Sequence, residues 1–473
     1  MEALKEIPLP PLDLERFRDV LPAGDYSAIE GAAEHAREVF DGRVIWHVNS
    51  TGRGGGVAEM LRTLPAYARG LGIDVRWVVV RGDPEFFAVT KRLHNRLHGV
   101  SGDGGPLGAR EREIYDRTLR EAGSELAGGV RERDVVFLHD PQTAGLAAPV
   151  RAAGPIVLWR CHVGLDIPNE LAREAWAFLR PYVEHADAYV FSRRAYSWEG
   201  LDTNKVWIVP PSIDAFSPKN QDLDAAKVRS ILKRIGLSDE GSPGETSFVR
   251  TDGTPGRVDR PAEIVQASRL SESVPVVSQV SRWDRLKDPV GVIECFERRP
   301  GDLVNLVLVG PATAAVADDP EGADVFEEVR SRREGLAADL RRRVHLVSLP
   351  MDDLEENAAM VNALQRRADV IVQKSLAEGF GLTVAEAMWK SRPVVASRVG
   401  GIQEQIVDGE SGILVDDPLD ADAFGVAISG LLADPARRRA IGAAARERIR
   451  EQFLANRHLL EYLNLIASLE PRR

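Results

Sequence analysis

The chain has 473 residues, of which 44% are hydrophobic and 28% charged, and its formal net charge is -11. This length exceeds what one hydrophobic core usually supports and predicts two or three domains. The acidic balance argues against nucleic-acid binding, which uses basic surfaces, and no apolar run approaches the roughly 20 residues that a membrane helix needs.

Cysteine usage and the first residues indicate where the protein works. The two cysteines, Cys161 and Cys295, lie far apart, so neither a disulfide framework nor a zinc-type spacing is present. Residues 1–18 are charged and contain prolines, without the apolar centre of a signal peptide. A reduced, cytoplasmic location is therefore expected.

The first half of the chain alternates predicted strands and helices. A partly helical lead-in over 1–40 is followed by apolar runs that predict strands at 43–49, 73–80, 134–138, 156–159, 188–192 and 206–209. Helical periodicity predicts helices at 58–69, 86–97, 110–126 and 169–184. Because the strands are apolar throughout, they fit a parallel sheet that is covered on both faces.

The same architecture is predicted a second time, without a repeat in the sequence itself. Strands are expected at 274–281, 303–309, 344–347, 370–373, 394–397 and 413–415, with helices between them. Pro210-Pro211 marks the junction, so the predicted domains are 1–215 and 216–448. Residues 238–273 are rich in Gly, Pro, Ser and charge, and are expected to form an exposed, mobile loop. Two doubly wound domains in series place a cleft between them, where ligands bind beyond the carboxyl ends of the strands.

The stretch from Glu378 to Glu386 organises the second half. It follows the apolar run 369–373, turns through Gly-Phe-Gly and enters helix formers at 385–390. A glycine-bent loop before a helix N-terminus binds anions well, because backbone N–H groups and the positive end of the helix dipole point outward. Two simpler interpretations stay open: Thr383 and Glu386 fit a capping box, T-x-x-E, and a loop carboxylate such as Glu378 is usually a solvated charge.

A glycine run at 52–56 follows the first strong strand and opens a helix. It departs from the dinucleotide fingerprint at the last glycine, has no obvious ribose-binding acid downstream, and lacks the Gly-Lys-Ser/Thr of a P-loop. A general phosphate cradle remains, formed by Gly54, Gly55 and Gly56. The alternative is a tight turn between a strand and a helix.

Charged and polar residues also follow other predicted strands. Arg282 and Lys287 come after 274–281 and could hold a diphosphate, with surface charge as the alternative. His162 follows 156–159, although a lone histidine is more often structural. The cluster 139–142 follows another strand and could bind hydroxyl groups. No Asp-x-Asp pair stands at a strand end, so no metal site is expected.

Together, Arg282-x4-Lys287, Glu378-x7-Glu386 and the N-terminal glycine loop resemble the retaining nucleotide-sugar glycosyltransferases of the GT-B fold, an α/β fold of two Rossmann-like doubly wound domains facing across a cleft. More narrowly, 47–61, 138–142, 159–162 and 279–284 look like the trehalose glycosyltransferring synthases. The insertion at 238–273 and Gly164 depart from that family.

The resemblance implies a reversible, metal-independent transfer of glucose from ADP-glucose or UDP-glucose to free glucose, which gives α,α-trehalose with retained configuration. It implies no cofactor and is compatible with a homodimer, while the acidic charge and the lack of a long apolar run predict no nucleic-acid or membrane partner. The acceptor would bind to the first domain and the donor to the second, and the C-terminal helix 449–473 would pack back on the first.

The resemblance also implies residue roles. Arg282 and Lys287 would hold the donor diphosphate. Glu378 would contact the donor glucose, Glu386 the ribose hydroxyls, and His162 the donor sugar near the reacting carbon. The remaining implied donor contacts are Gly54, Gly55, Gly56, Gly379, Phe380, Gly381, Leu382 and Thr383, and the implied acceptor contacts are Asn49, Glu59, Asp140 and Gln142.

Three alternatives stay open. The first is a related GT-B enzyme with another acceptor. The second is a trehalose phosphorylase, which uses glucose 1-phosphate and would need no nucleobase pocket. The third, from a different class, is a non-catalytic sugar-nucleotide sensor, against which the complete set of Arg282, Lys287, Glu378 and Glu386 argues.

Overall fold

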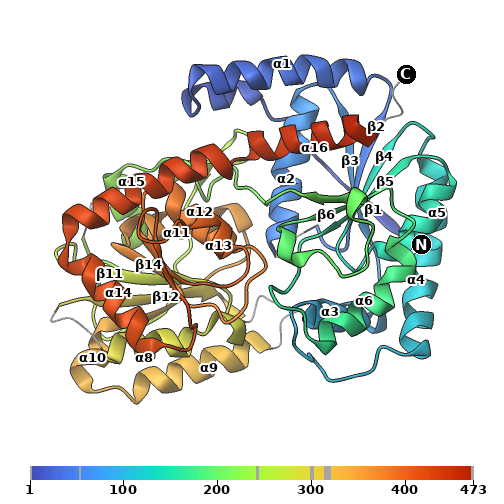
Figure 1. Ribbon diagram of the computed structural model, residues 1–473. Coiled ribbons are helices and arrows are strands. Elements are labelled where there is room, and N and C mark those ends of the chain that lie inside the picture. The colour runs from blue at the N-terminus through green and yellow to red at the C-terminus, as the bar shows by residue number, and fades with distance from the viewer. Residues whose placement is uncertain (1–2, 53–54, 241–243, 299–302, 314–320, 470–473) are drawn as a thin grey trace. The chain divides into compact units, whose positions relative to one another are not determined.

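A computed structural model describes residues 3–52, 55–240, 244–298, 303–313 and 321–469 (Figure 1). The chain forms two compact units: unit 1 is Met1–Ser212 with Leu454–Arg473, and unit 2 is Ile213–Phe453. The first boundary, after Ser212, lies one residue beyond the Pro210-Pro211 pair. Within the described ranges, no helix combines the length and the apolar character that crossing a bilayer requires.

Unit 1 is built on a seven-stranded sheet. Its strands are β1 (Leu4–Ile7), β2 (Val44–Asn49), β3 (Asp74–Val80), β4 (Val135–His139), β5 (Ile156–Cys161), β6 (Ala188–Phe191) and β7 (Val206–Ile208). They lie in the order β1-β3-β2-β4-β5-β6-β7, all parallel except β1. The chain first adds β3 on one side of β2 and then β4 on the other. The edge between β2 and β4 is thus a topological switch point, where α/β sheets bind ligands.

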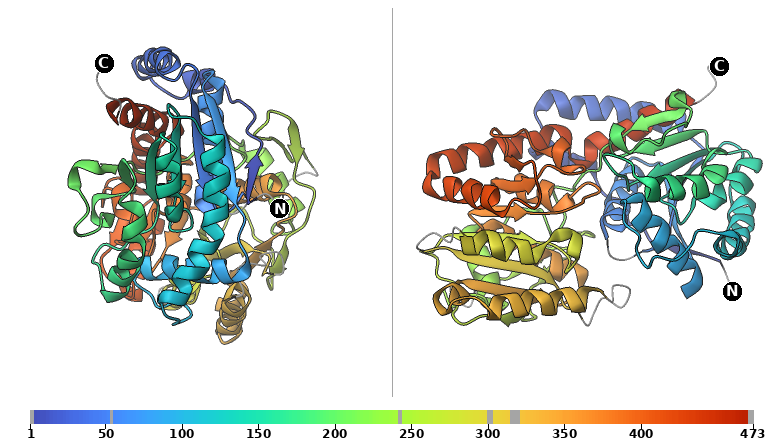
Figure 2. Two further views of the ribbon diagram at one scale, coloured as in Figure 1. Left: turned by 90° about the vertical axis from the view of Figure 1, so that its right-hand side faces the viewer. Right: turned by 60° about the horizontal axis from the view of Figure 1, so that its bottom comes forward.

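Two helix layers cover opposite faces of this sheet (Figure 2). The helices of the first layer, which contact one another, are α3 (Pro84–Leu97), α4 (Ala109–Gly129), α5 (Ala147–Ala152) and α6 (Glu170–Val183). Those of the second are α1 (Ala23–Val39), α2 (Gly55–Gly70) and α16 (Ala455–Leu469). Side chains alternate along each strand. Val48 and Leu138 accordingly join the core under the first layer, whereas Trp77 packs with Ala58 and Leu61 of α2.

Unit 2 repeats the design. Its main strands are β10 (Glu263–Val265), β11 (Val276–Val280), β12 (Asn305–Pro311), β13 (Val344–Leu349), β14 (Val370–Gln373), β15 (Val394–Ser397) and β16 (Ile413–Val415). The order is β10-β13-β12-β11-β14-β15-β16, all parallel except β10. The six parallel strands follow the Rossmann order, with the switch point between β11 and β14.

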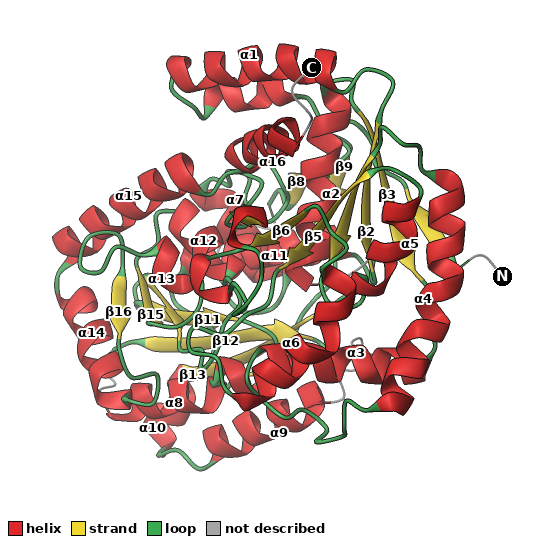
Figure 3. Ribbon diagram, turned by 45° about the vertical axis from the view of Figure 1, so that its right-hand side comes forward, coloured by secondary structure: helices red, strands yellow, loops and turns green. Residues whose placement is uncertain are grey.

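Helices lie on both faces of this sheet as well (Figure 3). One face packs against α8 (Pro289–Arg298), α9 (Glu321–Glu334) and α14 (Ala421–Ala433), whose apolar residues share a core with the strands. The remaining helices are α7 (Ala225–Arg234), α10 (Ala338–Arg343), α11 (Leu354–Arg367), α12 (Leu382–Trp389), α13 (Ile402–Gln405) and α15 (Pro435–Gln452). The two parallel sheets that the apolar strand runs predict are both present.

The segment 238–273 differs from the loop that its composition predicts. Its described residues contain the hairpin strands β8 (Ser247–Val249) and β9 (Pro255–Arg257) and the edge strand β10. Ion pairs attach the segment to the start of α11: Arg250 bonds Asp353 and Glu355, and Arg260 bonds Glu356. These contacts link positions about one hundred residues apart, so local composition could not reveal them.

Both ends of the chain also depart from the predicted pattern. The lead-in contains β1, an edge strand that pairs antiparallel with β3 from Leu4↔Val80 to Ile7↔Trp77. The predicted terminal helix 449–473 is divided, because the backbone leaves helical geometry at Phe453, with φ -136° and ψ 20°. Residues up to Gln452 belong to α15 of unit 2, and the helix that packs in unit 1 is α16.

Candidate active site

In unit 2 the candidate residues gather at the switch point. Residues 281–288 follow β11 and residues 374–381 follow β14, and the two loops are joined by a hydrogen bond from Leu376 N–H to the Leu286 carbonyl of 2.8 Å. Gln279 at the end of β11 donates from Nε2 to the Lys287 carbonyl over 2.8 Å. The loops are therefore fixed to each other and to the sheet before any ligand binds.

Lys287 and Glu378 face each other across these loops. The Lys287 Nζ lies 2.6 Å from Glu378 Oε2, and the two side chains are only 16% and 12% exposed. Ser375 Oγ donates to the same carboxylate oxygen over 3.2 Å. The sequence places these residues 91 positions apart, and the fold brings them together as an ion pair.

The two arginines of the first loop behave differently. Arg282 is 52% exposed in its side chain and lies 3.0 Å from Asp284 Oδ2. Arg285 pairs instead with Glu321 and Glu328 on α9. Arg285 is therefore an exposed cation that is held by acidic residues of a neighbouring helix.

Helix α12 begins at the glycine turn. Its N-cap is Gly381, which has φ 85° and ψ 59°, a left-handed conformation that favours glycine. Thr383 lies inside the helix, and its hydroxyl bonds Gln373 Oε1 at 3.3 Å. The capping-box interpretation of Thr383 and Glu386 is therefore wrong, because Thr383 is not the N-cap. Leu382 and Thr383 stand in the first turn, where backbone N–H groups have no acceptor within the helix.

Glu386 is fully buried in α12 at 1% exposure, and Lys219 Nζ lies 3.4 Å from its Oε1. The turn before the helix is held by Gln405, which donates to the Phe380 carbonyl over 2.5 Å. Gly379 accepts from the Gly401 N–H at 3.2 Å. The 379–383 backbone is thus a rigid cradle rather than a loose loop.

A second ion pair supports the first, and the sequence patterns did not indicate it. Lys374, which directly follows β14 and is 2% exposed, bonds Asp288 Oδ2. Asp288 has φ 47°, an uncommon conformation for a residue with a side chain, and its Oδ1 accepts from the Gly291 N–H. This pair fixes the backbone next to Lys287.

In unit 1 the described glycines of the run, Gly52, Gly55 and Gly56, follow β2 at the switch point between β2 and β4. Helix α2 begins at Gly55, which has φ 78°, and Gly55 and Gly56 are exposed. Gly54 lies outside the described residues. Glu59, one turn into α2, is half-buried.

The other predicted acceptor residues lie at the same edge. Asn49 ends β2 and uses both ends of its amide within unit 1: Nδ2 donates to the Thr51 carbonyl over 2.7 Å, and Oδ1 accepts from Trp77 Nε1 over 2.8 Å. Gln142 follows β4 and is half-buried.

Asp140 and His162 are connected through the backbone. Asp140 directly follows β4 with φ 64°, and its Oδ1 accepts from the His162 N–H at 2.8 Å. Burial raises the pKa of Asp140 to about 7, opposed by that hydrogen bond and by the charge of Arg160. Asp140 therefore fixes where His162 leaves the end of β5.

His162 is not a lone histidine. Its Nε2 lies 3.1 Å from His139 Nδ1, and His139 Nε2 lies 3.0 Å from His47 Nδ1. Burial lowers the pKa of His47 to about 3, and burial also lowers the pKa values of His139 and His162 well below the usual range. The bonds that join His47, His139 and His162 were not predicted: His139 was expected only as part of the polar cluster 139–142, and His47 only as part of the first strand.

The fold places this chain in a well-defined class. The solved α,α-trehalose-phosphate synthase (UDP-forming) of Burkholderia xenovorans aligns with a TM-score of 0.64 and 17% identity, over 91% of this chain and 100% of that one. Residues 262–448 match the family described as "Glycosyl transferases group 1". Two Rossmann-like units of this kind define a glycosyltransferase with the GT-B fold, which confirms the predicted fold class.

Similarity in sequence narrows the class. Residues 47–198 match the family described as "Trehalose synthase, N-terminal domain". The trehalose synthase of Pyrococcus horikoshii is 37% identical over 473 residues, which cover 99% of both chains. A trehalose phosphorylase of Pleurotus pulmonarius is 26% identical over 93% of this chain and 59% of its own. The chain belongs to the trehalose synthase family, as its motifs suggest.

Proposed function

We propose that this glycosyltransferase moves glucose from ADP-glucose or UDP-glucose to free glucose, and that the product is α,α-trehalose. The transfer retains the anomeric configuration, is reversible and uses no metal ion. Unit 2 binds the nucleotide sugar, and unit 1 binds the acceptor.

The observation that carries this proposal is the Lys287–Glu378 pair at the unit 2 switch point, with a nitrogen–oxygen distance of 2.6 Å. A departing nucleoside diphosphate gains negative charge, and a preformed, mostly buried ammonium group stabilises that charge without reorganising. The Glu378 carboxylate beside it suits sugar hydroxyl groups, which donate hydrogen bonds to carboxylates. Arg282, more exposed, adds a guanidinium group for the same diphosphate.

The helix at this site supports the remaining donor contacts. The first turn of α12, with Leu382 and Thr383, directs N–H groups and the positive end of the helix dipole to an anion. The buried Glu386 lies on the same helix and is assigned to the ribose hydroxyls. Gly379, Phe380 and Gly381 contribute backbone rather than side-chain contacts.

Unit 1 supplies neutral and acidic groups for sugar hydroxyls. His162 is assigned to the donor sugar near the reacting carbon, and Glu59, Asp140 and Gln142 to the acceptor glucose. Asn49 is proposed to support the acceptor site indirectly, by holding the loop at Thr51. Both ends of its amide already form hydrogen bonds within the unit. The proposal also assigns Gly54, Gly55 and Gly56 to the donor.

The chemistry requires that the bond between the glucose anomeric carbon and the diphosphate oxygen breaks while the acceptor oxygen attacks the same face. The electron pair of the broken bond goes to the diphosphate, and a departing phosphate oxygen takes the acceptor proton. Positioning and fixed charge provide most of the acceleration in such a scheme. The scheme does not need the pair of catalytic carboxylates that glycoside hydrolases use.

The test is to incubate the purified protein with free glucose and either ADP-glucose or UDP-glucose, with and without EDTA, and to follow products by NMR. We expect trehalose with the α configuration at both anomeric carbons, together with the nucleoside diphosphate, and we expect no effect of EDTA. Trehalose from glucose 1-phosphate without nucleotide binding would favour the phosphorylase activity of the more distant relative. Tight nucleotide-sugar binding without turnover for any acceptor would indicate a sensor.

A further inference from the structure

The three bonded histidines of unit 1 come from three neighbouring strands. His47 lies on β2 opposite Phe137 of β4, His139 lies two residues further along β4, and β5 places Arg160 opposite His139. Because side chains alternate along strands and Cα partners share a face, all of these side chains emerge on one face of the sheet. His162 continues that face beyond the end of β5. The series crosses the switch point between β2 and β4.

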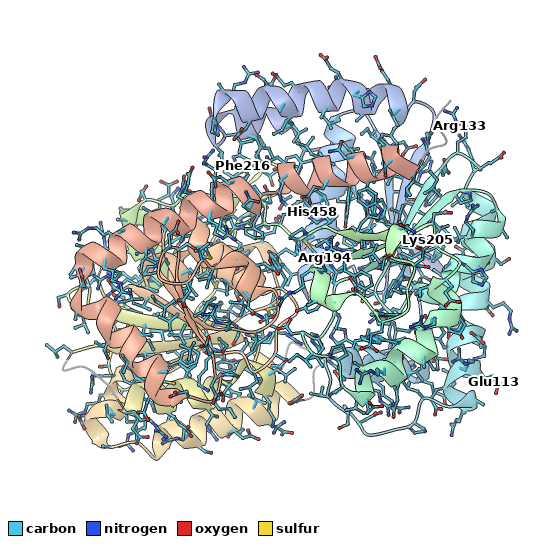
Figure 4. The ribbon with its side chains drawn as sticks, in the orientation of Figure 1. Glu113, Arg133, Arg194, Lys205, Phe216 and His458 are labelled. Atoms are coloured by element: carbon cyan, nitrogen blue, oxygen red, sulfur yellow. The ribbon has the colours of Figure 1, made fainter. Side chains whose placement is uncertain are left out.

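The rings are stacked as well as hydrogen-bonded. The His47 and His139 ring centres are 5.3 Å apart with planes at 28°, and those of His139 and His162 are 5.4 Å apart at 14°. Helix α16 covers this face with Tyr462, whose ring lies 4.7 Å from that of Phe137. Its neighbour His458, labelled in Figure 4, forms a hydrogen bond of 2.9 Å between its Nδ1 and Ser212 Oγ. The imidazoles are thereby held in a dry layer between strands and a helix.

These imidazoles are neutral. All three are buried, with exposures of 4% for His47, 2% for His139 and 9% for His162. The Arg160 guanidinium group, which is fully buried beside them, adds a positive charge that lowers the pKa values of His139 and His162 further. A neutral imidazole carries one N–H and one lone pair.

Because each neutral ring has only one N–H, the tautomers of His47, His139 and His162 depend on one another. Each His–His bond needs an N–H on one ring and a lone pair on the other. If His139 carries its proton on Nδ1, it donates to His162 Nε2 and accepts from His47, so all three rings are Nδ1–H tautomers. If His139 carries it on Nε2, the same reasoning makes all three rings Nε2–H tautomers. No mixed arrangement keeps both bonds.

The series ends at His162 with an unsatisfied ring nitrogen. His162 Nδ1 is a buried nitrogen without a hydrogen-bond partner among the residues that the structure describes. Its ring is fixed from one side by His139 and its backbone by Asp140. Whether Nδ1 offers an N–H or a lone pair depends on the proton position two rings away.

We propose that His139 and His47 are positioning residues for glucosyl transfer: they fix the tautomer and the ring plane of His162, so that its Nδ1 meets a sugar hydroxyl in one defined form. This role rests on the proposed function, because the sugar hydroxyl belongs to that reaction. In metal sites, partners that orient a histidine typically change activity by about 10- to 100-fold when removed, and we expect an effect of similar size here.

The first test needs no substrate. Selective 15N-histidine labelling and long-range 1H–15N correlation report the tautomer of each of the nine histidines, and single substitutions assign the peaks. His47, His139 and His162 are expected to show the same single tautomer. Mixed tautomers among the three, or rapid averaging at His162, would overturn the proposal whatever the activity of the protein.

The second test distinguishes the hydrogen bond that His139 makes to His162 from the space that its side chain fills. In His139→Asn the side-chain amide stands near the former Nδ1 and still reaches His162, whereas in His139→Gln it stands near the former Nε2 and reaches His47 instead. His139→Gln is expected to lower kcat by about 10- to 100-fold and to change the His162 tautomer, and His139→Asn to retain most activity. Equal losses in both variants, with the His162 tautomer unchanged, would overturn the proposal.

His345→Asn is the matched control. His345 is a buried histidine of unit 2, bonded to Asn305 at 3.5 Å and remote in sequence from the candidate residues. It should leave kcat and the His162 signal as in wild type. If the wild-type protein shows three matching tautomers but no transfer, the proposed function fails while the coupled proton order stands.

Discussion

Replacing Lys287 with methionine tests the candidate donor site most directly. The change removes the ammonium group but keeps an unbranched side chain, and it leaves Glu378 without the cation that lies 2.6 Å from its Oε2. Loss of one preorganised group that stabilises the transition state typically lowers kcat by about 100- to 1,000-fold, or roughly 3–4 kcal/mol. We expect a loss of this size in trehalose formation.

The same change should also alter stability, and the two effects can be separated. Removing one partner of a buried ion pair typically costs about 3–5 kcal/mol, because the other charge is left buried and unpaired. The two side chains here keep 16% and 12% exposure, so the lower part of that range is expected. Lys287→Met combined with Glu378→Gln should recover stability, since no unpaired charge remains, but should not recover turnover.

Arg285→Met is the matched control, because Arg285 is a cation of the same loop that pairs with Glu321 and Glu328 on the surface. Exposed pairs contribute about 0–1 kcal/mol, so both its turnover and its urea midpoint should stay close to wild type. Initial rates of nucleoside diphosphate release at saturating glucose provide the measurement. Turnover of Lys287→Met equal to that of Arg285→Met would refute the role assigned to Lys287.

Two further outcomes follow from other contacts. Burial raises the pKa of Asp140 to about 7, so the folded protein holds a proton that the unfolded chain releases above about pH 4, and this carboxyl's contribution to stability falls as the pH rises. Asp140→Asn should therefore gain stability relative to wild type between about pH 4 and pH 7, by up to about 4 kcal/mol. Urea titrations of both proteins at several pH values test this. A difference in unfolding free energy that stays constant with pH would contradict it. A Cβ added at Gly401 would stand 2.6 Å from Phe380 Cα and 2.9 Å from the Gly379 carbonyl oxygen, so Gly401→Ala should displace the donor cradle and raise the KM for the nucleotide sugar. Gly430→Ala, where a Cβ meets nothing within 4 Å, should leave KM unchanged and stabilise α14 by about 0.5–1 kcal/mol; equal KM values in both variants would refute the packing argument.

The parts of the fold and site that the sequence predicted are those with local signatures. Apolar strand runs between helical segments are enough to predict two parallel sheets, because buried parallel strands need no alternation. The candidate residues at 282–287 and 378–386 were found because each stretch joins a strand to a helix within a few positions. Their convergence follows from the rule that ligands bind at the carboxyl ends of such strands.

The parts that escaped prediction depend on which strands are neighbours. His47 and His139 bond because β2 and β4 are adjacent although β3 lies between them in sequence. Lys374 meets Asp288 for the same reason, since β14 lies beside β11. The capping box was a false local signal, because the positive φ of Gly381 placed the start of α12 earlier than a threonine cap would.

The switch point of unit 2 is lined by ion pairs and that of unit 1 by neutral histidine side chains. This difference matches the chemistry assigned to each unit. Unit 2 holds opposed charges in contact, Lys287 with Glu378 and Lys374 with Asp288. Each of these lysines is thus matched by a carboxylate, so that neither cation is buried and unpaired before a diphosphate binds. Unit 1 instead has neutral imidazoles around His162. Neutral donors and acceptors suit sugar hydroxyls, because they gain hydrogen bonds without the desolvation cost of a buried charge. If His162 were charged, it would stand beside a buried Arg160 and oppose the positive charge that develops on the sugar as its bond to the diphosphate breaks. The neutral histidine series thus keeps a positive charge away from the reacting carbon and also offers a hydrogen bond to the sugar.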